Sequence, residues 1–202
     1  MSGKSELLLF SDPAPQSVIK SSIFDEVGPT STINNNPDAT YDFHIKGSNT
    51  QYLDLNESSI VVKLRVYNVV ANLPLNLKAA DDVAGCNFFL NALFKDVSLT
   101  LNNRLVEGGN ALYPYKSTID QIFNFRESSR DFHHGGAGYG PRADRVALIS
   151  RSMEVVLTGT LCLDFLNQPK LLLPGIDVHI RLTRGPDLFA IEGTGAIDPK
   201  LV

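Results

Sequence analysis

The alternation of apolar and polar residues predicts a chain built mainly from β-strands. Val97, Leu99 and Leu101 alternate with polar residues, which is the period of two expected for a half-buried strand. Asn102 and Asn103 follow, and because asparagine tolerates positive φ we expect a tight hairpin turn there. Comparable patterns predict further strands in residues 22–28, 41–46, 59–70, 104–107, 146–163 and 176–183.

Two stretches have a helical rather than a strand pattern. Residues 85–95 are so apolar that they predict a short, buried helix. In residues 114–125, four apolar side chains fall on one helical face, and we expect that face to pack on a sheet. These four are Tyr115, Ile119, Ile122 and Phe123.

Glycine and proline divide the chain into its expected parts. Residues 126–145 contain four glycines and a proline and are predicted to be an irregular loop. We expect an N-terminal arm in residues 1–21, a domain in residues 22–192 and a linker-like tail in residues 193–202. With about eight strands, two short inserted helices and no strand-helix-strand alternation, the pattern favours an all-β fold, an antiparallel sandwich of jelly-roll type.

Composition narrows the possible functions without naming one. A net charge of −4 argues against a domain that mainly binds nucleic acid, since phosphate binding relies on clustered Lys and Arg. No stretch approaches the ~20 apolar residues of a membrane-spanning helix. Cys86 and Cys162 lie far apart in apolar contexts, which favours two buried thiols and leaves a disulfide as the alternative.

Candidate chemistry is sparse, and we expect no enzyme, metal or cofactor. His133 and His134 are adjacent and would point apart in a strand, while His44 and His179 occupy outward strand positions. The glycine-rich run lacks the Gly-Lys-Ser/Thr of a phosphate-binding loop. No serine stands in a Gly-x-Ser-x-Gly elbow, and no carboxylate pair is fixed on one face by spacing.

The order and spacing of several short motifs are distinctive. They are Tyr52-Leu53-Asp54-Leu55, Asn87-x5-Leu93-Phe94-x2-Val97-x-Leu99-x-Leu101-Asn102, Tyr113-Pro114-Tyr115, Gly159-x-Leu161-x2-Asp164-Phe165-x2-Gln168, Leu171-Leu172-Leu173-Pro174-Gly175-Ile176-Asp177-Val178 and Asp187-x-Phe189. Across residues 5–191 this order resembles the N-terminal half of the capsid-type protein of Polinton/Maverick elements and adintovirus-like viruses.

The resemblance implies a structural virion protein, the first jelly roll of a double jelly-roll major capsid protein. Such subunits trimerise into pseudo-hexagonal capsomers of an icosahedral shell, together with other capsid proteins and inside a host cell. The chain departs from that pattern because it has room for one jelly roll only. An arm would dock on a neighbour, and a loop would be exposed or make inter-subunit contacts. The arm residues are Leu7, Leu8, Leu9 and Phe10, and the loop residues are His133, His134, Tyr139, Arg142 and Arg145.

Two other functions stay open at this point. The first is a jelly-roll binding module that holds a carbohydrate or a protein on its loops, with Tyr113, Tyr115 and Tyr139 as contact residues. The second is a cupin-like metalloenzyme, which the absence of a His-x-His motif with a following Glu disfavours.

Overall fold

The computed structural model describes residues 19, 21–34, 36–71, 73–124, 134–193 and 199–201. Its main sheet has four antiparallel strands in the order β1-β9-β6-β7. Their bounds are β1 (Thr40–Ile45), β9 (Val178–Arg184), β6 (Phe94–Leu101) and β7 (Arg104–Glu107).

The remaining described strands form three small antiparallel groups. Strand β2 pairs with β8, β3 pairs with both β4 and β11, and β5 pairs with β10. Their bounds are β2 (Ile60–Leu64), β8 (Val155–Gly159), β3 (Val66–Val70), β4 (Leu73–Asn76), β11 (Pro199–Leu201), β5 (Val83–Gly85) and β10 (Ile191–Gly193).

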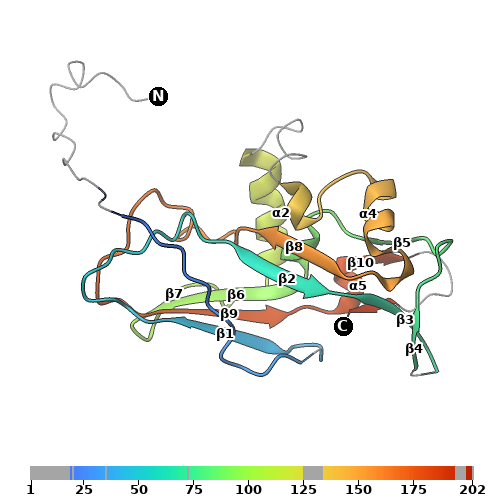
Figure 1. Ribbon diagram of the computed structural model, residues 1–202, viewed down its shortest axis with the longest axis horizontal. Coiled ribbons are helices and arrows are strands. Elements are labelled where there is room, and N and C mark those ends of the chain that lie inside the picture. The colour runs from blue at the N-terminus through green and yellow to red at the C-terminus, as the bar shows by residue number, and fades with distance from the viewer. Residues whose placement is uncertain are drawn as a thin grey trace, which may run out of the picture.

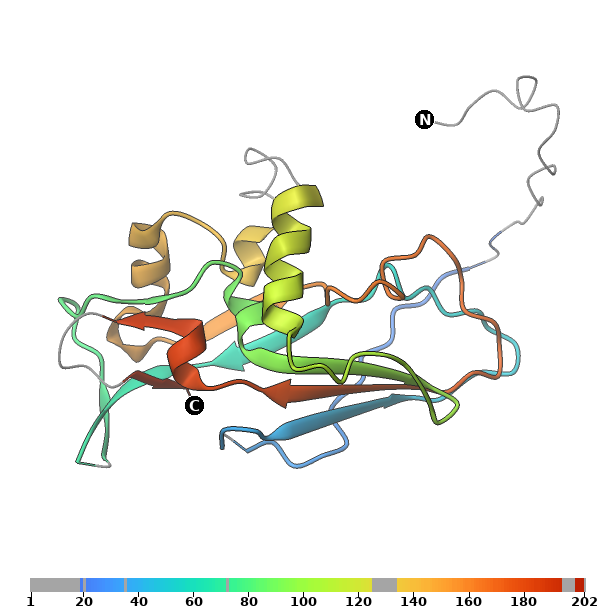
Figure 2. The same cartoon turned by 180° about the vertical axis from the view of Figure 1, so that it is seen from behind.

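The pairing of early strands with late ones is nested. Strand β1 pairs with β9 in one sheet, and β2, the next strand along, pairs with β8 in the other. The two pairs lie in separate layers in both views (Figure 1, Figure 2). A chain that folds back on itself in this way, with successive antiparallel pairs in alternate sheets, has the arrangement of a jelly roll. The all-β antiparallel fold expected from the sequence is therefore confirmed.

The core lies between these two layers. Val97 and Leu99 of β6 face inward, and across the sheet they pair with Leu182 and Ile180 of β9. In the opposite layer, every second residue of β2 and β8 is less exposed than its neighbours, as expected for strands with one face toward the core. Of these residues, Leu64, Val155 and Leu157 are buried.

The strand predicted in residues 59–70 is interrupted. Residues 59–70 form β2 and β3, which belong to different sheets, with Arg65 between them. The apolar residues that alternate along this segment nevertheless face the core, because Leu64 and Val66 are buried and Ile60 packs against it. Residues 22–28 form no strand, although they were expected to be one.

The short, buried helix predicted in residues 85–95 forms, but it is shorter than predicted. Only α1 (Phe89–Ala92) is helical there, because Gly85 ends β5 and Phe94 begins β6. Phe88 has a φ of 58°, and this left-handed backbone stops the helix from extending further back. A Cβ on Gly85 would lie 2.7 Å from the Phe89 ring, so the ring packs on a strand that only glycine allows so close.

Residues 134–152 are more helical than the sequence indicated. The irregular loop expected in residues 126–145 is wrong at its end, because α4 (Arg142–Ile149) begins there, while residues 125–133 lie outside the described part of the chain. The strand expected from residue 146 begins only at Val155. Short 3-10 turns, Gly135–Ala137 and Ser150–Ser152, flank α4.

The predictions for the two ends of the chain can be compared with the structure to different extents. Most of the predicted arm, including Leu7, Leu8, Leu9 and Phe10, lies outside the described residues. In the tail, Gly193 ends β10, and Pro199–Leu201 form β11 against β3. The division into arm, domain and tail stays a prediction.

A candidate assembly surface on helix α2

Helix α2 (Tyr113–Asn124) forms where it was predicted, but the face that it turns toward the protein is the opposite of the predicted one. Its N-terminal end lies at the strands and its C-terminal end projects away from them (Figure 1, Figure 2). The side that packs on the protein carries Tyr113, Ser117 and Gln121, which are buried. The predicted apolar face points outward instead: Tyr115 is 56% exposed, Ile119 52%, Ile122 45% and Phe123 83%.

A buried hydrogen-bond network explains why the more polar side of α2 faces the protein. The hydroxyl of Tyr113 donates to Oδ1 of Asn91 over 2.7 Å and accepts from the backbone N–H of Cys162 at 3.1 Å. The amide of Gln121 donates to Sγ of Cys162 at 3.2 Å. Buried polar groups cost little once they are paired. The bonds of the Tyr113 hydroxyl and of the Gln121 amide nitrogen therefore offset much of the cost of burying these two side chains where the apolar pattern predicted isoleucine and phenylalanine. The Oε1 atom of Gln121 is buried without a hydrogen-bond partner among the described residues.

Charged residues fix the same helix at its partly exposed edge. Nζ of Lys116 lies 2.7 Å from Glu107 and 2.8 Å from Asp164. Glu107 also accepts the backbone N–H groups of Asp164 and Phe165. Burial lowers the pKa of Lys116, but the hydrogen bonds and charges of Asp164 and Glu107 outweigh it and raise that pKa. Lys116 therefore stays charged and joins α2, β7 and the segment after Leu163.

We expect the Tyr113→Phe variant to lose about 2 kcal/mol of unfolding free energy. The change removes both hydrogen bonds of the hydroxyl and leaves Oδ1 of Asn91 and the Cys162 N–H without these partners in the interior. Urea unfolding followed by circular dichroism measures the loss. Tyr115→Phe is the matched control, and it should leave the midpoint unchanged because that side chain is mostly exposed. Equal midpoints for the two variants would show that the network does not hold α2.

The two cysteines are free thiols, as the sequence favoured, and neither is activated. Burial, together with the nearby Glu192 charge, raises the pKa of Cys86 to about 11, although the Arg145 charge opposes the shift. Burial also raises the pKa of Cys162, against the opposing hydrogen bond from Gln121. A raised thiol pKa favours the neutral form, which is a poor nucleophile.

Cys86 should therefore react slowly with iodoacetamide in the folded protein. With a pKa of about 11, only ~0.1% of the thiol is ionised at pH 8, and labelling should accelerate as the pH rises toward 11. Mass spectrometry of protein labelled with and without urea measures the difference, which we expect to exceed about 100-fold. Rapid labelling of the native protein at pH 7 would contradict this picture of a buried, protonated thiol.

The predicted loop residues are brought together, but in two different environments. Tyr139 stacks on Phe88 with ring centroids 4.7 Å apart, and the buried His134 meets Phe88 edge-on at 5.6 Å. Arg142 is exposed and pairs with Asp82. His133 lies outside the described residues. Their role in contacts between subunits stays a prediction.

Arg145 is a structural residue rather than an exposed contact. It is buried, its Nε donates to the carbonyl of Gly140 at 3.0 Å and its Nη1 donates to the carbonyl of Gly85. Nη1 also lies 3.5 Å from Glu192 of β10. The guanidinium thus joins the glycine-rich turn, β5 and β10.

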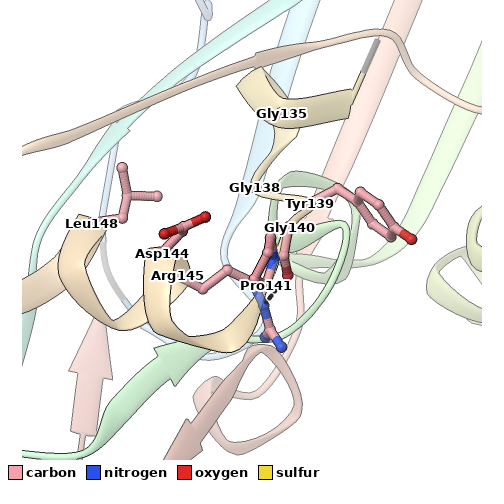
Figure 3. A pocket seen from close by; sticks show the side chains of 8 residues that line it. All are labelled: Gly135, Gly138, Tyr139, Gly140, Pro141, Asp144, Arg145 and Leu148. Carbon is pink, nitrogen blue, oxygen red and sulfur yellow. Dashed lines mark hydrogen bonds between the residues drawn. The ribbon is translucent and has the colours of Figure 1, made fainter. Parts of the chain in front are cut away.

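The pocket beside Arg145 is a poor site for an anion. It has a volume of about 410 Å³ and is formed by the glycine-rich turn and α4 (Figure 3). The guanidinium is already bonded to backbone carbonyls, and Asp144 places a carboxylate in the first turn of α4. A carboxylate there opposes the favourable field of the helix N-terminus for anions. The phosphate interpretation of the glycines thus finds no support in this geometry.

Other candidate chemistry is equally unsupported by the described residues. His44 and His179 face each other on β1 and β9, and their rings stack in parallel with centroids 3.9 Å apart. Within the described ranges, no group of three or more His, Cys, Asp or Glu side chains is placed to hold a metal ion. Among the described helices, none is long and apolar enough to cross a membrane.

The tyrosines proposed for ligand binding do not form one surface. Tyr113 is buried in the network below α2, and Tyr139 is stacked on Phe88. Tyr115 alone of the three is largely exposed, and its ring meets Phe189 of α5 (Asp187–Ala190) edge-on at 5.4 Å. The sequence did contain a signal for the buried side, because Tyr113, Ser117 and Gln121 are spaced by four residues along one helical stripe.

Comparison with solved structures returns virus capsid proteins. A structure of the PBCV-1 protein VP54, fitted into a reconstruction of the virophage Sputnik, matches 92% of this chain and 43% of that chain at 12% identity, with a TM-score of 0.45. The mavirus major capsid protein matches 95% of this chain and 48% of that chain at 11% identity, with a TM-score of 0.43. A PBCV-1 capsid structure matches 85% and 43% at 14% identity, with a TM-score of 0.41.

The chain thus spans less than half the length of the solved capsid chains it matches. No protein-family model and no curated protein sequence matches it. The solved structures it matches are virus capsid proteins, which is the class of protein that the sequence motifs resemble.

Proposed function

We propose that this chain is a structural, non-enzymatic jelly-roll domain of a virus-type capsid subunit. The observation that carries the proposal is the outward apolar face of α2, held in place by a buried network that has no other evident use. A domain in which a buried hydrogen-bond network holds an apolar helix face outward is suited to assembly rather than to catalysis. The order of the sequence motifs supports a capsid as the assembly in question.

The proposal includes the finer features that the sequence resemblance implies. The subunit trimerises into capsomers, and capsomers together with other capsid proteins form a closed shell within the host cell. The residues 7–10 arm, the glycine-rich loop of residues 133–141 and the exposed Arg142 lie at contacts between subunits. Genome contacts belong to other chains, since this chain has a net charge of −4.

Electron microscopy of the purified product of the native gene tests this function. We expect closed shells of uniform size built from repeating units. Preparations without particles, across a range of salt and protein concentrations, would contradict the proposal. A glycan array or ligand screen on the same preparation would then reveal whether a binding module is the better description.

A further inference from the structure

The exposed face of α2 is large enough to form the core of a protein interface. Its exposed side chains are Tyr115, Ile119, Ile122 and Phe123, and Phe189 of α5 continues it. Since an aromatic side chain has roughly 150–250 Å² of surface, these five expose on the order of 500 Å². A stable interface of standard size covers about 800 Å² per partner, and about 65% of a homodimer interface is apolar, which is on the order of 500 Å². The exposed face of α2 therefore has the apolar area that such an interface needs.

The face consists of a groove and a protrusion at opposite ends of one helix. A groove of about 310 Å³ lies beside the first half of α2, lined by Pro114, Tyr115 and Ile119 and closed by Phe189. Phe123, the most exposed member of the face, lies near the other end. Eight residues separate Tyr115 from Phe123, which is about 12 Å along an α-helix.

This arrangement is self-complementary. If two copies place their α2 helices antiparallel, Phe123 of each copy meets the groove of the other, as a twofold contact requires. None of the residues that line the groove is charged. A partner recognised by ion pairing, such as a nucleic acid, therefore finds no counter-charge in the groove, and the groove presents no charge that would repel a second acidic copy.

We propose that the α2 face binds the α2 face of a second copy of this chain through an antiparallel, twofold contact. This inference goes beyond the proposed function, because it depends on the α2 surface and not on any particular assembly. In a shell built from trimers it supplies the link between one trimer and the next, since a threefold contact alone closes on itself.

Analytical ultracentrifugation of the 202-residue chain tests the contact. We expect a species of about twice the 22.1 kDa of one chain, in equilibrium with monomer. Ile119→Asp should weaken dimerisation by about 100-fold, because the contact would bury an unpaired carboxylate. Leu173→Asp is the matched control, since Leu173 is 63% exposed against 52% for Ile119 and follows Leu172, which pairs with Leu53 and not with α2. Its dimerisation should change by less than about twofold.

Three results would overturn the proposal: a wild-type chain that stays monomeric, an Ile119→Asp variant that still dimerises, and an equal loss in the Leu173→Asp control. Circular dichroism confirms that each variant is folded. A second measurement needs no disruptive change. Oxidation of a mixture of Tyr115→Cys and Phe123→Cys proteins should join position 115 of one chain to position 123 of the other, and the absence of that cross-link would contradict the antiparallel geometry.

Another part of the native gene product is the competing occupant of this face. Radical footprinting of the dissociated native product should label Tyr115 and Phe123, and protection in single subunits would overturn the self-contact. The failure of this contact would leave the capsid proposal intact if shells form. The absence of shells would reject the capsid proposal even if the α2 contact is found.

Discussion

Replacing Gly108 with alanine should destabilise the domain by about 3 kcal/mol or more, one of the largest effects we expect from a single methyl group. Gly108 has a φ of 105°, a backbone that L-residues rarely adopt. A Cβ there would overlap the carbonyl oxygen of Val97 and lie 2.5 Å from Cα of Ser98. Both of these atoms belong to the backbone, so rotation of a side chain cannot relieve the overlap.

The loss of stability caused by Gly108→Ala should also affect helix α2, which carries the candidate assembly surface. The turn after β7 leads into α2, and Asp96 holds it by accepting the backbone N–H of Gly109 at 3.0 Å. Thermal unfolding should show a fall of roughly 6–12 °C in Tm for a domain of this size.

Gly109→Ala provides the matched control for this prediction. Gly109 also has a positive φ, 84°, but the nearest atom to an added Cβ is a flexible side-chain carbon of Leu105 at 3.9 Å. It should therefore cost about 1 kcal/mol, the conformational term alone. If both variants lose the same stability, close approach of the turn to β6 is not what requires glycine at position 108.

Replacing Arg145 with alanine should cost about 3 kcal/mol of unfolding free energy. The side chain is buried and bonds to the carbonyls of Gly140 and Gly85. Without it, both acceptors lose a charge-assisted partner in a place that water reaches poorly, and unpaired buried acceptors are costly. The glycine-rich turn, β5 and β10 would lose their common attachment.

Arg142→Ala separates this structural effect from a simple loss of positive charge. Arg142 stands three residues earlier on the same helix, is exposed and pairs with Asp82. Exposed ion pairs contribute little, so we expect no measurable change in the urea midpoint. A control that loses as much stability as Arg145→Ala would show that net charge on α4, rather than the buried bonds, is responsible.

Alternation of apolar and polar residues predicted the main sheet well, because that sheet has one face toward the core. Val97 and Leu99 are buried at alternate positions of β6, and in β9 Val178 and Leu182 are buried with the partly buried Ile180 between them. The Asn102-Asn103 turn was predictable for a local reason, since both residues adopt positive φ, at 45° and 64°.

Local pattern failed where the decisive partner was distant in sequence. The break at Arg65 depends on β2 and β3 pairing with strands in separate sheets, which no property of residues 59–70 encodes. The short α1 depends on Gly85 admitting the Phe89 ring and on the left-handed backbone of Phe88. A run of apolar residues cannot distinguish this turn from a full helix.

The candidate surface was predicted in composition but not in orientation. The apolar face of α2 was identified, yet the hydrophobic pattern alone assigns such a face to the core. Asn91 and Cys162 reverse that assignment by pairing with Tyr113 and Gln121, and they lie well outside the helix sequence. Arg145 was predicted to lie in an exposed loop. The sequence could not reveal its burial, because its hydrogen-bond partners are backbone carbonyls, which leave no trace in the pattern of side chains.

The solution mass of the native gene product, measured by light scattering under conditions that keep shells dissociated, tests the capsid proposal most directly. A particle with the mass of three chains is the expected result, because trimeric capsomers are the units from which the proposed shell is built. A product that remains a single chain at every concentration would contradict the capsid proposal, because a monomer cannot supply the trimeric capsomers from which the shell is built.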